Sequence, residues 1–151
     1  MKAFENIDEV LDFAMNAEQE AVDFYTQLAS VMSNQQMKET FLEFAKEEIK
    51  HKARLEKIKE EKIFEQNPEK VADLKIADYT VNVTPSPNMN YADALVLAMK
   101  KEKAAFRLYY ALAERTTNPE LKKVFEELAI EESKHKLKFE IEYDEHVLRD
   151  N

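Results

Sequence analysis

Residues 41–52 read FLEFAKEEIKHK and residues 125–136 read FEELAIEESKHK, so the same pattern returns after 84 positions. Each copy carries a glutamate followed three residues later by a histidine: Glu48 and His51, then Glu132 and His135. In a helix, side chains three residues apart project from one face about a turn apart, so each pair can chelate one metal ion. The repeat predicts two similar helices that each present a metal-binding pair.

The repeat extends into the segments that precede these two. At the same offset, residues 11–29 align with residues 95–113 and share leucines, alanines, one glutamate and one tyrosine. The shared glutamates, Glu18 and Glu102, stand among apolar residues at helical spacing, so we expect them to face the core. Each half of the chain is therefore expected to be a helical hairpin, and the two hairpins to be copies.

Four long helices are expected because apolar residues recur every three or four positions in long stretches without glycine. Their predicted ranges are residues 7–32, 35–62, 91–115 and 119–148. A crossover over about residues 63–89 holds three of the four prolines, and here we expect a short helix at 68–75 and then an extended stretch. The predicted fold is all-α: one domain over residues 1–151, a four-helix bundle of two duplicated hairpins joined by a long crossover.

The composition excludes several classes of function. Glycine is absent, which argues against the phosphate-binding loops of nucleotide folds, and cysteine is absent, which excludes disulfides, thiol nucleophiles and thiolate-held metals. The formal charge of −9 repels nucleic acid and anionic membrane surfaces. With no secretory pattern at the start and no apolar run long enough for a membrane span, we expect a cytoplasmic protein without nucleic-acid or membrane partners.

The distance of each glutamate from its hairpin turn predicts its depth in the bundle. The turns centre near Ser33 and Thr117, and Glu18 and Glu48 both lie 15 residues from Ser33. That is about 22 Å along antiparallel helices at ~1.5 Å per residue. The same arithmetic places the glutamates of the second hairpin level with each other. Six side chains are thus predicted to meet in mid-bundle: Glu18, Glu48, His51, Glu102, Glu132 and His135.

Four carboxylates in an apolar interior are costly unless cations balance them. Two divalent cations would cancel the four negative charges. Oxygen-rich ligation with two histidines suits iron or manganese and tolerates zinc, and iron has the strongest claim because this ligand set recurs in di-iron bundles. The alternative is a buried polar network in which the glutamates and histidines satisfy one another.

Two further pairs of duplicated residues are candidates for positioning the ligands. Tyr25 and Tyr109 lie two helical turns beyond Glu18 and Glu102, where each could bond a carboxylate of the other half or simply pack in the core. Glu47 and Glu131 could accept the free ring N–H of the opposite histidine or lie on the surface.

The order single Glu, Glu-x-x-His, single Glu, Glu-x-x-His over four helices resembles the ferritin-like di-iron carboxylate proteins, and among them the rubrerythrin type. The segments AVDFYTQLA at residues 21–29 and EEIKH at residues 47–51 resemble rubrerythrin helices. The resemblance covers nearly the whole chain. It implies a ferritin-like bundle, a homodimer, two iron ions (Fe2+/Fe3+) held by the six residues, and reduction of peroxide or dioxygen with oxidation of ferrous iron.

The chain departs from the rubrerythrin pattern at two points, and it lacks the haem ligand of the bacterioferritins, whose di-iron centre its six residues also resemble. Full-length rubrerythrins carry a cysteine-ligated rubredoxin domain, and without cysteine this chain would need an external electron-donor protein. They also carry an additional glutamate three residues after the ligand of the third helix, where this chain has Ala105. Bacterioferritins bind haem through a methionine at the position of Ile49, so no haem site is expected.

Three functional hypotheses follow from the sequence. The first is an oxidoreductase in which two ferrous ions reduce peroxide or dioxygen. The second is a non-catalytic protein that binds and buffers iron. The third is a di-iron oxygenase acting on an organic substrate, which would require an apolar channel to the metals.

Overall fold

The computed structural model describes residues 7–61, 84–116 and 118–148, and four long helices make up most of them. These are α1 (Ile7–Val31), α2 (Gln35–Glu61), α4 (Tyr91–Arg115) and α5 (Pro119–Tyr143). Their bounds confirm the predicted helices to within a residue, except at the end of the fourth. The expected short helix at 68–75 and the extended stretch after it lie outside the described residues.

The fourth helix changes pitch near its end. Residues Asp144–Leu148 form the π-helical turn η2, where an α-helix was predicted to continue to residue 148. Tyr91 contacts the chain on both sides of this change: its hydroxyl donates to Glu142 at 2.9 Å, and its ring packs edge-on against that of His146. The wider turn therefore coincides with the anchoring of the last helix on the start of α4.

Asparagine side chains cap three of the helices. Asn34 accepts from the backbone N–H of Gln36 at 2.8 Å, and Asn90 accepts from that of Asp93 at 2.8 Å. Asn118 accepts from the N–H groups of residues 120 and 121, ahead of a proline in the first turn of α5. Such caps satisfy N–H groups that have no partner within the helix, so they define where each helix begins.

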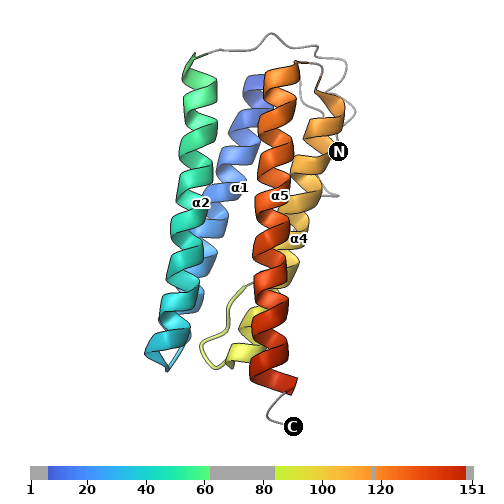
Figure 1. The fold of residues 1–151 in the computed structure, drawn as a ribbon. Coiled ribbons are helices and arrows are strands. Elements are labelled where there is room, and N and C mark those ends of the chain that lie inside the picture. Colours follow the sequence, from blue (N-terminus) through green and yellow to red (C-terminus); the bar gives the residue numbers. More distant parts are fainter. Residues whose placement is uncertain (1–6, 62–83, 117, 149–151) are drawn as a thin grey trace.

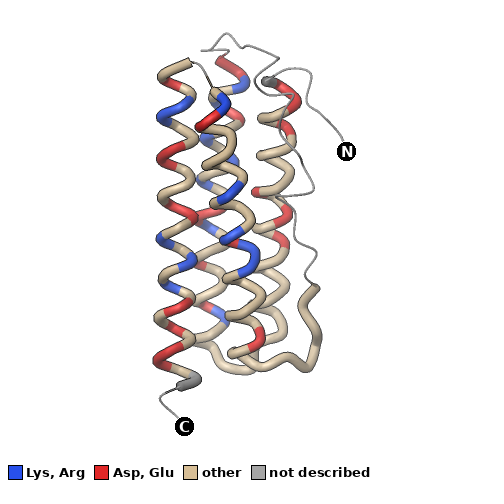
Figure 2. Tube along the Cα trace, turned by 90° about the vertical axis from the view of Figure 1, so that its right-hand side faces the viewer, with Lys and Arg blue, Asp and Glu red and all other residues tan. Residues whose placement is uncertain are grey.

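The helices form two antiparallel hairpins side by side, α1 with α2 and α4 with α5 (Figure 1). The α2 helix ends at the end of the bundle opposite to that where α4 begins (Figure 1). This agrees with the predicted arrangement of two hairpins joined by a connection that spans the bundle. Acidic and basic residues are distributed along the helices (Figure 2), and no helix in the described ranges is long and apolar enough to cross a membrane.

The hydrophobic core consists of two layers, one towards each end of the bundle. One layer joins the start of α1 to the end of α4 and includes Leu11, Leu55 and Phe125. The other joins the end of α1 to the start of α4 and includes Phe41, Leu95 and Phe139. Polar residues that are buried lie between these layers, and they form the site described next.

Candidate metal centre

All six residues predicted to meet in mid-bundle are buried, and each helix contributes at least one of them. Their exposed fractions are 2% for Glu18, 1% for Glu48, 7% for His51, 1% for Glu102, 0% for Glu132 and 3% for His135. Charged residues are rarely this buried unless they are paired or coordinate a metal. The structure thus brings together every residue that the repeat and the turn arithmetic singled out.

The six residues form two overlapping groups with the spacing of metal ligands. In each group the candidate ligand atoms lie within 4.8 Å of one another. Glu48 and Glu132 belong to both groups, whereas one glutamate and one histidine are particular to each: Glu18 and His51, then Glu102 and His135. The arrangement is that of two adjacent cation positions with two carboxylates between them.

The histidines face these shared carboxylates. His51 Nδ1 lies 2.7 Å from Glu132 Oε1, across the bundle, and His135 Nδ1 lies 3.2 Å from Glu48 Oε1. The two imidazole rings are nearly parallel, with centroids 5.7 Å apart. Each histidine therefore leans towards the glutamate of the other hairpin, which ties the two halves together at the site.

Most of the polar atoms that face the centre of the site have no hydrogen-bond partner. Seven buried atoms of the described residues are in this state, and they come from all six side chains, including both carboxylate oxygens of Glu132. The 2.7 Å approach between His51 and Glu132 also lacks hydrogen-bond geometry. Unpaired buried polar atoms are costly, so this geometry fits a set of metal ligands and not the polar network, left open by the sequence, in which the glutamates and histidines satisfy one another.

The raised pKa values of two buried glutamates also indicate a cation site. Burial raises the pKa of Glu48 well above its usual range, and the nearby charges of Glu102 and Glu18 raise it further. Burial also raises the pKa of Glu132, and the surrounding carboxylates again add to the effect. Without cations, these carboxyls resist ionisation, and divalent cations would reverse that preference.

Two tyrosines bond the site across the hairpins. The Tyr25 hydroxyl donates to Glu102 Oε1 at 2.5 Å, and the Tyr109 hydroxyl donates to Glu18 Oε1 at 2.5 Å. Burial raises the pKa of both phenols well above the ordinary value, so both remain donors. Each tyrosine thus orients the glutamate that is particular to one cation position, leaving its other oxygen free to face the centre.

The surroundings of the two tyrosines differ although the backbone repeats. The Tyr25 ring has three phenylalanines of α2 and α5 within 6.4 Å of its centroid, namely Phe41, Phe44 and Phe139. The Tyr109 ring stacks on Phe125 at 6.3 Å, in a layer that is otherwise mainly aliphatic. The repeat of ligands is therefore embedded in an asymmetric core.

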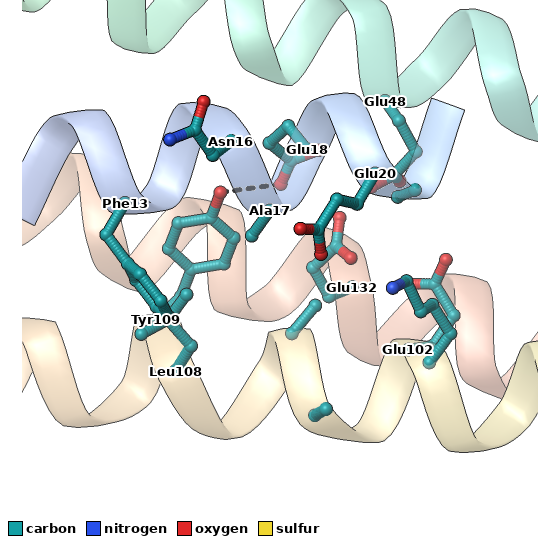
Figure 3. A pocket seen from close by; sticks show the side chains of 14 residues that line it. Phe13, Asn16, Ala17, Glu18, Glu20, Glu48, Glu102, Leu108, Tyr109 and Glu132 are labelled. Atoms are coloured by element: carbon teal, nitrogen blue, oxygen red, sulfur yellow. Dashed lines mark hydrogen bonds between the residues drawn. The ribbon is translucent and has the colours of Figure 1, made fainter. Parts of the chain in front are cut away.

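A cavity of about 400 Å3 connects this centre to the surface between α1 and α4. Figure 3 shows Glu18, Glu48, Glu102 and Glu132 on it together with Tyr109. Small residues make room for it, among them Ala17 on α1 and Ala105 on α4. The sequence did not predict this cavity, although the alanines around Glu18 and Glu102 were an available signal.

The structure corrects the role considered for Glu47. Its carboxylate is 41% exposed and pairs with Lys50 at 3.7 Å, so it does not orient a histidine. Glu131, its duplicate, is half-buried, outside both ligand groups.

Comparison with known proteins places this geometry in context. The model of the rubrerythrin family matches residues 9–143, whereas no curated protein matches the chain. A solved Thermotoga maritima protein described as a ferritin-like diiron-carboxylate protein is similar with a TM-score of 0.74 and 22% identity, over 96% of this chain and 99% of that one. A hypothetical protein from Pyrococcus furiosus is similar with a TM-score of 0.70 and 27% identity, over 92% and 89%. These similarities confirm the predicted ferritin-like bundle.

Proposed function

Because the chain belongs to the rubrerythrin family, we propose that its core binds two iron ions and that it is an oxidoreductase reducing peroxide or dioxygen. The observation that carries the proposal is the set of seven unpartnered buried atoms converging from four carboxylates and two imidazoles. Hard oxygen ligands with two imidazoles suit ferrous iron, and they also admit manganese or zinc.

The six candidate ligands are distributed over the two cation positions. Glu18 and His51 would hold one ion, Glu102 and His135 the other, and Glu48 and Glu132 would contribute to both. A bound pair of ferrous ions supplies two electrons, one from each ion, to the oxidant. The remaining side chains keep the centre in place, because the tyrosine hydroxyls hold Glu18 and Glu102 in orientation.

Reduction of the oxidised site is proposed to come from a separate electron-donor protein. The chain has no cysteine, so it contains no thiolate-held redox centre of its own. The apolar layers on both sides of the site limit water access, and the cavity between α1 and α4 offers the oxidant a way in.

Anaerobic loading with ferrous iron, metal counting, and stopped-flow mixing with hydrogen peroxide or dioxygen test the proposal. We expect two irons per chain and rapid oxidation, faster with peroxide if the protein is a peroxide reductase and faster with dioxygen if it is a ferroxidase. Two irons that are oxidised slowly by both would replace the proposal with iron buffering. Failure to bind iron would overturn the metal site itself.

The matched variants are Glu48→Gln and Glu47→Gln, which change neighbouring residues on α2. Glu48 is buried and shared by both ligand groups, so its amide should reduce binding from two irons per chain to one or fewer. Glu47 pairs with Lys50 outside the site, so its amide should bind two irons. Two irons in Glu48→Gln would contradict the assignment of the ligands.

A further inference from the structure

The cavity between α1 and α4 has walls and a floor of different chemistry. Its floor consists of the site glutamates, while the walls are largely apolar. The apolar residues are Phe13, Ala17, Ala21, Ala104, Ala105 and Leu108. Its volume of about 400 Å3 includes the space between the site glutamates where cations would lie, and it falls within the range of small-molecule pockets.

The cavity follows the internal repeat of the chain only in part. Most of its lining residues are repeat partners, such as Glu18 with Glu102 and Ala21 with Ala105, whereas four line it without their partners: Phe13, Asn16, Leu108 and Tyr109. The repeat places Lys101 where Ala17 stands in the other half, and the Lys101 ammonium lies 5.7 Å from the centre of the Phe24 ring. The chamber extends instead towards Tyr109 and Leu108. A passage for dioxygen or hydrogen peroxide would not require this extension beyond the repeated residues.

The charges around the cavity favour a neutral ligand. Five of its lining residues are glutamates and one is a lysine. If two divalent cations balance the four glutamates of the site, only Glu20 and Lys101 remain, and their charges cancel. A carboxylate or phosphate ligand would lose hydration in such a chamber without meeting a net positive charge, which is unfavourable. An uncharged molecule avoids this cost.

From these features we infer that the cavity binds the alkyl or aryl group of a neutral organic hydroperoxide, with the peroxide group directed at the site. Such a hydroperoxide has an apolar part and a polar part, as the cavity does. Its alkyl or aryl group matches the alanine, leucine and phenylalanine walls, and its O–O group matches the polar floor. The inference rests on the proposed function, which it deepens by naming the substrate class.

The reaction balances with the electrons that the proposed site supplies. The O–O bond of ROOH breaks, two electrons come from oxidation of two ferrous ions to ferric, and two protons come from solvent. The products are the alcohol ROH and one water. The external electron donor then returns two electrons to the site.

Binding is tested without turnover on the zinc-loaded and the metal-free protein, using 2-phenyl-2-propanol, the alcohol product of cumene hydroperoxide, as the probe. We expect NMR shifts at Ala17, Ala104 and Ala105, and loss of these shifts in Ala105→Leu and Ala17→Leu, which fill the cavity from opposite helices. Ala92→Leu is the control, because Ala92 is also half-buried on α4 but lies outside the cavity. Shifts that are absent, or that persist in both filled variants, would overturn the inference.

The kinetic arm compares cumene hydroperoxide with hydrogen peroxide on the ferrous protein, after circular dichroism and metal counting have verified each variant. Filling the cavity should lower the rate with cumene hydroperoxide about tenfold more than the rate with hydrogen peroxide. An equal effect on both peroxides would overturn the inference while leaving the proposed function intact. If neither peroxide oxidises the ferrous protein, the proposed peroxidase function is wrong. The NMR binding experiment would then still decide whether the cavity binds the organic group. A parallel incubation of the ferrous protein with cumene and dioxygen tests the oxygenase alternative, and formation of 2-phenyl-2-propanol from cumene would overturn the inference in its favour.

Discussion

At the scale of single residues, the site combines carboxyls that resist ionisation with phenols that resist losing their protons. Glu132 is fully buried, and burial together with the neighbouring carboxylates raises its pKa. Tyr25 and Tyr109 are also buried, and both donate to glutamates. Without cations, the site therefore carries an electrostatic cost that depends on pH.

The pH dependence of the metal-free protein follows from the raised pKa of Glu132. Below the ordinary glutamate value of 4.5, both the folded and the unfolded chain are protonated and the folded state keeps its full stability. As the pH rises, the unfolded chain ionises first, so the free energy of unfolding falls until the folded pKa is passed. Without metal, we expect Tm to fall as the pH rises above 4.5, and to fall less in Glu132→Gln.

Calorimetry on chelator-treated protein checks this prediction, with Glu131→Gln as the adjacent variant outside the site. With zinc bound, the wild type should have a higher Tm than Glu132→Gln, because it has a metal ligand that the variant lacks. A slope in Glu132→Gln as steep as in the wild type would show that other groups cause the pH dependence.

Each tyrosine hydroxyl holds the glutamate of one cation position, so removing the hydroxyl should weaken metal binding at that position. Tyr25→Phe keeps the ring in its aromatic layer but removes the bond to Glu102, and we expect about 10-fold to 100-fold weaker binding of one metal ion. Competitive titration with a zinc chelator measures this loss. Tyr91→Phe is the control, since the Tyr91 hydroxyl bonds Glu142 outside the site. Unchanged affinity in Tyr25→Phe would assign Tyr25 to core packing alone.

At the scale of elements, each helix buries a stripe that is interrupted once, at mid-height, by ligands. The α2 helix shows this order: Phe41, Phe44 and Ala45 precede Glu48 and His51, and further apolar residues follow. The helices can keep these polar residues inside because the apolar layers above and below stabilise the bundle. The metal centre is thus a short polar segment within otherwise ordinary amphipathic helices.

The aromatic layer of the core, formed by Tyr25, Phe41, Phe44 and Phe139, should contribute strongly to the stability of the bundle. Phe139 is fully buried and its ring centroid lies 4.1 Å from that of Phe44 and 5.8 Å from that of Tyr25. Phe139→Ala should lower the free energy of unfolding by about 3–5 kcal/mol, because it leaves a cavity in this layer. Urea unfolding measures the loss. Lys138→Ala, which changes the exposed neighbour on α5, should stay within about 0.5 kcal/mol; a similarly small loss in Phe139→Ala would show that the layer is loosely packed.

At the scale of the whole molecule, the outer surface of the bundle carries apolar side chains on two neighbouring helices. Arg54 of α2 bonds Glu127 of α5, so these helices adjoin. The exposed apolar side chains are Leu42 and Ile49 on α2, and Ile130, Leu137 and Ile141 on α5. These positions lie seven residues apart on α2, and seven and four residues apart on α5, which places them on one face of each helix.

We expect these faces to support the homodimer that the sequence resemblance implies. Sedimentation equilibrium should give twice the 17.7 kDa mass of one chain. Leu137→Glu and Ile130→Glu should shift it to the monomer, because they place a charge within an apolar face. Tyr110→Glu changes an equally exposed residue on α4 and should leave the dimer intact. A wild type at the monomer mass over the whole concentration range would contradict the prediction.

The prediction from sequence succeeded where the information is local or repeated. Glu18 and Glu48 were placed level because each lies the same number of residues from one turn, and a helix converts residue number into height. Their duplicates in the second hairpin obey the same rule. Glu47 was harder, because adjacent residues on a helix differ in direction by about 100°, and only the packing decides which of two glutamates enters the core.

The sequence by itself determined the four helices, the two hairpins and the six side chains that meet in the core, because helical periodicity and the 84-residue repeat specify both face and height. Only the tertiary structure decided how the hairpins are joined through the site, with Tyr25 reaching Glu102 and Tyr109 reaching Glu18. It also decided that a cavity lies beside Ala105. The physical reason is that the space between two helices depends on the summed volumes of side chains distant in the sequence, and no periodicity along one helix records that sum.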